Sequence, residues 1–248
     1  MRYFSIPLAL MLLLMANTNA AVYKDEVRYY DVEVLLFENV KPNPTNTETW
    51  PSSLEFEVPE NSLFIGSPYP GPIPAEYNPR FTFKPIKAST YQLQKEAKIL
   101  DENENYRVLY HRSWRQPGMD RENAVSVKFQ REIPRVKLPV SITEDNPSIS
   151  TEQIDYNRIV NERLPDTNNL QGLIKITLSR FLHIQTDIQY TRHVVEDNQE
   201  NPDASFAKIK PQVYLLKQTR KMRSKELHYL DHPRLGLLVY ITPVQVKK

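Results

Sequence analysis

The stretch that decides the fold is LQGLIKITLSRFLHIQTDIQYTRHV, residues 170–194. Apolar and polar side chains alternate through it with a period of two, the spacing of a β-strand with one buried face. The apolar face holds Ile174, Ile176, Leu178, Leu182, Ile184, Ile188 and Tyr190, and the polar face holds Lys175, Thr177, Ser179, His183, Gln185, Asp187 and Gln189. The pattern predicts one long, half-exposed strand, or a strand bent at a bulge.

Arg180 falls on the apolar face of this predicted strand. A buried guanidinium is costly unless a carboxylate or several carbonyl groups satisfy it. Glu33, Glu226 and Asp231 are the available carboxylates. We expect a structural ion pair between Arg180 and Glu226.

Further strands are predicted on both sides of this stretch, where β-branched and aromatic residues recur in short runs. The expected strands cover residues 29–40, 106–114, 124–129, 213–222 and 235–244. One clear helix is expected at residues 89–102, because Ser89 and Gln92 have the spacing of a capping box and apolar residues then recur at helical intervals. A single helical turn is expected after Ser150. The fold class is therefore α+β, with a mainly antiparallel sheet.

Residues 41–85 differ from the rest of the chain, since they hold ten of its twenty prolines. Proline fixes φ and lacks an N–H donor, so neither a helix nor a central strand continues through this segment. We expect a long proline-rich loop that covers the fold. Packing by its aromatic side chains is favoured over a ligand groove; these are Trp50, Phe56, Phe64, Tyr69, Tyr77, Phe81 and Phe83.

The first twenty residues have the layout of a secretory signal peptide. Arg2 is followed by an apolar run over residues 6–15 and by small residues before a predicted cleavage after Ala20, with Ala21 as the alternative site. The apolar run is too short for a spanning helix, and no later stretch approaches that length. We expect residues 1–20 to be removed and residues 21–248 to form a single periplasmic domain.

Composition excludes several classes of protein. The chain has no cysteine, which rules out disulfides, thiolate metal sites and a cysteine nucleophile. With five glycines it has no G-x-S-x-G motif and no glycine-rich phosphate loop. Loss of Arg2 with the signal peptide lowers the formal net charge from +2 to +1, which argues against a nucleic-acid binder. No cofactor is expected.

A charged segment separates the last two predicted strands: RKMRSKELHYLDHPRLG, residues 220–236. His228 and His232 are four residues apart, a spacing that places two imidazoles on one face of a helix, as in many metal sites. Pro233 prevents a helix from continuing there, and the glutamate of the metalloprotease motif is absent. We therefore predict no metal site.

Four segments resemble the CsiV-type peptidoglycan-binding proteins. They are YDVEVLLF at residues 30–37, LYHRSWRQP at residues 109–117, LQG at 170–172 with RFLH at 180–183, and RKMRSKELHYLDHP at residues 220–233. They follow the family's order over nearly the whole mature chain. Lys221 stands where a second arginine is expected, and Phe181 where a tyrosine is expected; both departures keep the charge or the shape.

The resemblance implies a non-catalytic periplasmic regulator of cell-wall synthesis. Such a protein binds peptidoglycan and acts through an outer-membrane lipoprotein that activates a bifunctional class A penicillin-binding protein. The resemblance implies no cofactor and assigns no binding residues.

We expect the second and fourth of these segments to form one ligand-binding surface. Arginine side chains bind carboxylates such as those of peptidoglycan stem peptides, and aromatic rings stack on the apolar faces of sugars. The predicted surface comprises Arg220, Arg223, His228, Tyr229, Asp231, His232, His111, Trp114 and Arg115. Two alternatives stay open: a cell-wall hydrolase with a metal at His183, His228 and His232, and a periplasmic adaptor that binds proteins but not glycan.

Overall fold

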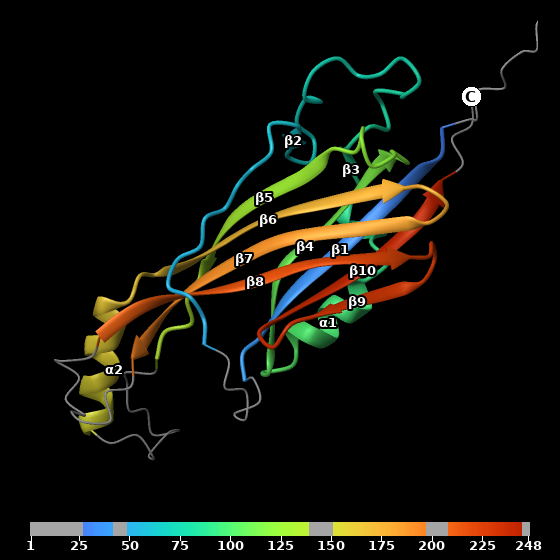
Figure 1. Cartoon of the computed structure of the whole chain (residues 1–248). Helices are drawn as coiled ribbons and strands as arrows, with labels where there is room; N and C mark the ends of the chain where they lie inside the picture. The colour runs from blue at the N-terminus through green and yellow to red at the C-terminus, as the bar shows by residue number, and fades with distance from the viewer. Residues whose placement is uncertain (1–26, 42–48, 139–150, 197–207, 245–248) are drawn as a thin grey trace, which may run out of the picture.

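The computed structural model describes residues 27–41, 49–138, 151–196 and 208–244 (Figure 1). Within these ranges ten strands form two five-stranded sheets that lie face to face. The first sheet has the order β3-β4-β1-β10-β9, and the second has the order β2-β5-β6-β7-β8. Neighbouring strands are antiparallel except for β2 and β5. The predicted α+β class with mainly antiparallel strands is confirmed, but the strands divide between two sheets instead of forming one.

The first sheet is built around β1 (Tyr29–Asn39), which pairs with β4 (Tyr106–Pro117) on one side and with β10 (Leu235–Val244) on the other. The short strands β3 (Lys84–Pro85) and β9 (Leu227–Asp231) form its edges. Strands predicted at residues 29–40, 106–114 and 235–244 are confirmed. β9 was not predicted, because it lies within the charged segment at residues 220–236.

The second sheet contains β2 (Ser62–Leu63), β5 (Ser126–Pro134), β6 (Thr167–Leu178), β7 (Leu182–Glu196) and β8 (Lys208–Met222). The prediction of one continuous strand over residues 170–194 is wrong: the chain reverses at residues 179–181, where the Ser179 N–H donates to the Phe181 carbonyl at 3.0 Å. Leu178 lies opposite Leu182, so the three-residue turn preserves the alternation. The predicted apolar face therefore points inward from both strands of a hairpin.

The core fills the space between the sheets. Trp114 from the first sheet and Tyr190 and Tyr214 from the second are among its largest fully buried side chains. Phe129 stacks on Tyr110 of the opposite sheet, with ring centroids 4.3 Å apart. Gly172 allows this arrangement, because a Cβ there would collide with the Phe129 ring. Close packing of this kind makes the core sensitive to the addition of a single methyl group.

In the part of the chain that the structure describes, two α-helices lie outside the sheets (Figure 1). Helix α1 (Gln94–Asp101) covers the outer face of the first sheet, and a short 3-10 turn (Ala88–Thr90) precedes it. The predicted helix was too long at its start, and the expected capping box is wrong, since the N-cap residue Leu93 makes no side-chain cap. Helix α2 (Thr151–Arg163) occupies thirteen residues where one helical turn was expected.

The two sheets leave an open seam along each side of the sandwich. Across each seam, side chains of the second sheet donate hydrogen bonds to backbone carbonyl groups near the edge of the first sheet. At one seam, Gln218 Nε2 donates to the Asp231 carbonyl at 2.7 Å, and Arg220 Nη1 donates to the Tyr229 carbonyl at 2.5 Å. At the other, Arg131 Nη1 donates to the Leu109 carbonyl at 3.1 Å. These bonds satisfy backbone groups that an edge strand leaves without a ladder partner.

The described part of the proline-rich segment, residues 49–85, contains only β2, β3 and irregular backbone. Trp50, Ile65, Tyr69 and Tyr77 pack against the core, whereas Phe64 is 46% exposed. Residues 42–48 and the predicted signal peptide lie outside the described residues.

Candidate functional site

The charged segment at residues 220–236 connects the two sheets and does not form a compact cluster of ligands. It comprises the end of β8, a turn, β9, a second turn and the start of β10. Arg220 and Arg223 are exposed. His228 lies within 3.1 Å of the backbone of Arg223, whose N–H donates to its Nε2. Much of the segment's polar chemistry therefore holds this hairpin together.

Tyr229 and Asp231 form a small exposed unit on the outer face of the first sheet. The Tyr229 hydroxyl donates to Asp231 Oδ1 at 2.6 Å, and its ring lies parallel to Phe37 with centroids 6.2 Å apart. Partial burial, together with the Asp231 hydrogen bond, raises the pKa of Tyr229 above its usual value. Tyr229 as a whole residue is 42% exposed, so it is accessible from solvent.

His232 belongs to a packed cluster. Its ring lies 5.0 Å from the Trp50 ring, and the Arg234 N–H donates to its Nδ1 at 3.1 Å. Burial lowers the pKa of His232 to about 4, so the ring is neutral near pH 7. Its role in this structure is to hold Trp50 and the start of β10.

The residues of the second segment that resembles the family, 109–117, have different roles in the structure. Trp114 is fully buried between the sheets and donates through Nε1 to Gln116 at 2.8 Å, so its prediction as a ligand-binding residue is wrong. The alternation of β4 directs Trp114 inward and its neighbours Ser113 and Arg115 outward.

His111 is largely buried beneath the start of α1. Its Nε2 lies 2.7 Å from the buried carboxylate of Glu33, which also accepts the N–H groups of Gln92 at 2.6 Å and Leu93 at 2.9 Å. A carboxylate on β1 thus caps α1, in place of a cap from the helix's own sequence. This position gives His111 a structural role, and it does not line the groove described next; its place on a ligand-binding surface stays a prediction.

Arg115 opens onto a groove in the outer face of the first sheet. It forms a bidentate pair with Asp31, through Nε to Oδ1 at 2.6 Å and Nη2 to Oδ2 at 2.8 Å. The groove has a volume of about 530 Å³. Its walls include Ser113, Lys225, Tyr240 and Thr242. The second segment thus reaches the groove through the predicted residue Arg115, and the fourth reaches it through Lys225, which was not predicted. We call it the arginine groove.

Lys225 reaches the arginine groove with an unusual backbone conformation. Its φ is +63°, in the left-handed region, and its N–H donates to the Ile241 carbonyl at 2.7 Å. A non-glycine residue pays roughly 1 kcal/mol for this conformation, and such outliers are concentrated at functional sites. The ammonium group has no ion-pair partner among the described residues.

The predicted pair between Arg180 and Glu226 is not formed. Arg180 lies exposed in the β6–β7 turn, with its guanidinium over the Phe181 ring at 5.5 Å from the centroid. Glu226 lies 3.7 Å from Arg223 instead. The prediction is wrong because it assumed that the strand continued through residue 180.

The histidines of the metal-site alternative do not gather. His183 lies on the outer face of the second sheet opposite Lys221, while His228 and His232 occupy the positions described above. Across the described ranges, no group of three or more His, Asp or Glu side chains could hold a metal ion.

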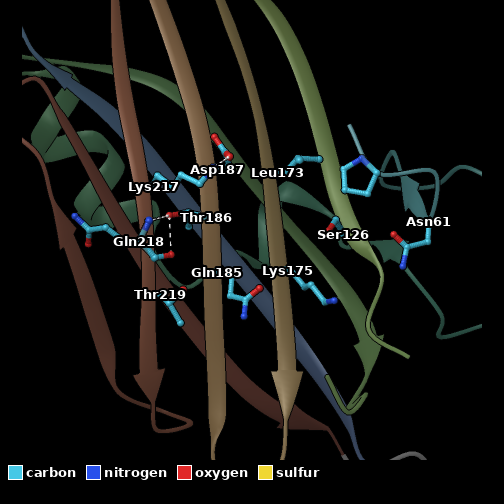
Figure 2. A pocket seen from close by; sticks show the side chains of 11 residues that line it. Asn61, Ser126, Leu173, Lys175, Gln185, Thr186, Asp187, Lys217, Gln218 and Thr219 are labelled. Carbon is cyan, nitrogen blue, oxygen red and sulfur yellow. Dashed lines mark hydrogen bonds and ion pairs between the residues drawn. The ribbon is translucent and has the colours of Figure 1, made fainter. Parts of the chain in front are cut away.

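A second groove, not predicted from the sequence, lies in the outer face of the second sheet (Figure 2). Ser126, Lys175, Gln185 and Thr219 form one row across four strands, because each is in register with the next. Asp187 and Lys217 form an ion pair of 2.8 Å in the adjacent row. Pro59 and Asn61 complete a groove of about 500 Å³, which we call the glutamine groove.

The sequence did contain a signal for the glutamine groove. Lys175, Gln185 and Asp187 alternate with core residues and were assigned to the polar face, but alternation alone does not separate a solvated face from a groove. The wall formed by Pro59 and Asn61 comes from a distant segment with no regular period.

Comparisons with known proteins identify the family. A family model described as "Peptidoglycan-binding protein, CsiV" matches residues 5–244, nearly the whole chain, so the protein belongs to this family of peptidoglycan-binding proteins. Membership of a peptidoglycan-binding family indicates that the protein is located in the cell envelope. No curated protein and no solved structure matches the chain. Within the described residues, no helix has both the length and the apolar character needed to cross a membrane.

Proposed function

We propose that this protein is a non-catalytic periplasmic protein that binds peptidoglycan stem peptides in the arginine groove. After removal of the signal peptide, it promotes cell-wall synthesis through an outer-membrane lipoprotein that activates a class A penicillin-binding protein. The family supports the peptidoglycan ligand. The lipoprotein and synthase are expectations from the family resemblance.

One observation carries the choice of site: Arg115 and Lys225, from distant parts of the chain, line the same groove. Stem peptides carry carboxylates, and a carboxylate is bound most strongly by charge-assisted hydrogen bonds from such cations. Arg115 is oriented by Asp31, which leaves its Nη1 free of that pair. Lys225 can supply a second, more flexible ammonium donor.

A binding role is favoured because the acids of the groove are already engaged. Asp31 is paired with Arg115, and Glu33 accepts two backbone N–H groups and contacts His111. A general acid or base needs a carboxyl group that can exchange a proton with the substrate. Neither carboxylate is free to do so in this arrangement.

Co-sedimentation with purified sacculi tests the proposal. Lys225→Gly removes the ammonium group at a position whose backbone suits glycine, and Lys95→Ala removes a matched exposed charge from α1. We expect wild type and Lys95→Ala to sediment alike, and Lys225→Gly to bind about tenfold more weakly. Equal binding by folded Lys225→Gly and wild type would contradict the assignment of this groove, and release of soluble fragments would contradict the non-catalytic role.

A further inference from the structure

The glutamine groove on the opposite outer face contains three polar side chains that form no hydrogen bond with the described part of the protein. Gln185, Thr219 and Asn61 make no side-chain hydrogen bond to any described residue, yet all three line one groove. In Figure 2 these groups come from β7, β8 and the segment before β2. Converging, unengaged polar groups in a concave site are the usual basis of ligand orientation.

The charge of the groove favours a neutral ligand. Lys217 is paired with Asp187, and this pairing raises the pKa of Lys217. Lys175 Nζ donates to the Arg121 carbonyl at 3.2 Å. The remaining polar side chains of the lining are amides and hydroxyls, each of which can both donate and accept a hydrogen bond. They match hydroxyl and N-acetyl groups, which have the same dual character, better than they match a carboxylate.

The geometry favours a chain of sugars over an extended peptide. A peptide that binds a sheet usually adds to its edge, where free backbone groups lie. Here the groove crosses the outer face of the sheet, where side chains and not backbone groups point outward. The row from Ser126 to Thr219 crosses four strands and spans roughly 14 Å at the usual strand spacing. Leu173 and Pro59 add apolar surface against which a ring can lie.

We propose that the glutamine groove binds the glycan strand of peptidoglycan, as an N-acetylated, polyhydroxylated sugar chain, separately from the stem peptides. This inference rests on the proposed function, because it assigns a second part of the same polymer to a second site. The two grooves lie on outward faces of different sheets, so one molecule holds glycan and peptide on opposite sides of the sandwich. Linked binding of this kind raises the overall affinity without new contacts.

The test uses glycan strands that an amidase has freed of stem peptides, titrated into the protein by calorimetry. Two variants change the groove: Gln185→Ala removes an amide, and Thr219→Ala removes a hydroxyl on the edge strand β8. The control, Gln130→Ala, removes an exposed glutamine from the same face of the sheet outside the groove. We expect wild type and Gln130→Ala to bind equally. Gln185→Ala and Thr219→Ala should each bind about fivefold more weakly.

Lys225→Gly separates the two proposals, since it should leave the affinity for peptide-free strands unchanged. Binding of intact sacculi without binding of peptide-free strands overturns this inference alone, as does unchanged affinity in both groove variants. If wild type binds neither material, the proposed function fails and this inference fails with it.

Discussion

At the scale of single residues, Glu33 is the side chain on which the arginine groove depends most. It is buried on β1 and accepts the N–H groups of Gln92 and the N-cap residue Leu93, which immediately precede α1, while His111 contacts its Oε1. The carboxylate thereby fixes the segment before α1, where Gln92 lines the groove. Sequence alone could not identify it as a cap, because 59 residues separate Glu33 from Gln92.

Glu33→Gln should lower the free energy of unfolding by about 2 kcal/mol, since an amide nitrogen would face an N–H group that the carboxylate now satisfies. Urea denaturation measures this loss. Glu102→Gln is the matched control, because its carboxylate lies 3.6 Å from Lys98 in an exposed helical pair worth little. Equal stability of the two variants would contradict the capping role.

His232 gives the protein a pH dependence of stability with a defined sign. Its folded pKa is about 4, below the ordinary value of 6.5, so the unfolded chain takes up a proton first as the pH falls. The stabilising contribution is complete above pH 6.5 and is lost progressively toward pH 4.

Between these pH values, we expect the free energy of unfolding of wild type to fall by about 1 kcal/mol more than that of His232→Asn. This figure is reduced to allow for solvent screening at the partly exposed ring. Asparagine is a suitable substitute because its side-chain oxygen can accept the Arg234 N–H in place of Nδ1. Thermal unfolding at several pH values measures the difference. Parallel profiles for the two proteins would show that His232 does not titrate in this range.

At the scale of elements, the hairpin β6–β7 shows what alternation can and cannot predict. The inward face of residues 174–190 was assigned correctly, but the reversal at residues 179–181 was missed. An odd-numbered turn leaves the period of two intact, so nothing in the pattern marks it. Arg180 was consequently placed in the core when it lies in the turn.

Gly172 on β6 tests how closely the sheets pack. Gly172→Ala should cost about 2 kcal/mol, because its methyl group would displace the Phe129 ring that stacks on Tyr110. Gly172→Ala combined with Phe129→Leu should cost less than the sum of the two single changes, since the smaller side chain removes the collision. Denaturant midpoints measure all three variants. Strict additivity would contradict the packing described here.

At the scale of the whole molecule, the strands and their faces were largely predictable, whereas their division between two sheets was not. Each sheet combines strands that are far apart in sequence, as in the pairing of β1 with β10. The arginine groove was partly predictable, because Arg115 belongs to it and the segment 220–236 reaches it through Lys225. Trp114 was misassigned because composition suggested a stacking surface, while strand alternation directs it inward.

The most direct test of the central claim, carboxylate recognition in the arginine groove, compares intact sacculi with sacculi whose carboxyl groups have been converted to methylamides. We predict that wild type binds the amidated material about tenfold more weakly, and that Lys225→Gly loses little further affinity on it, because the lysine and the carboxylate act as a pair. Equal binding of wild type to both materials would contradict the account.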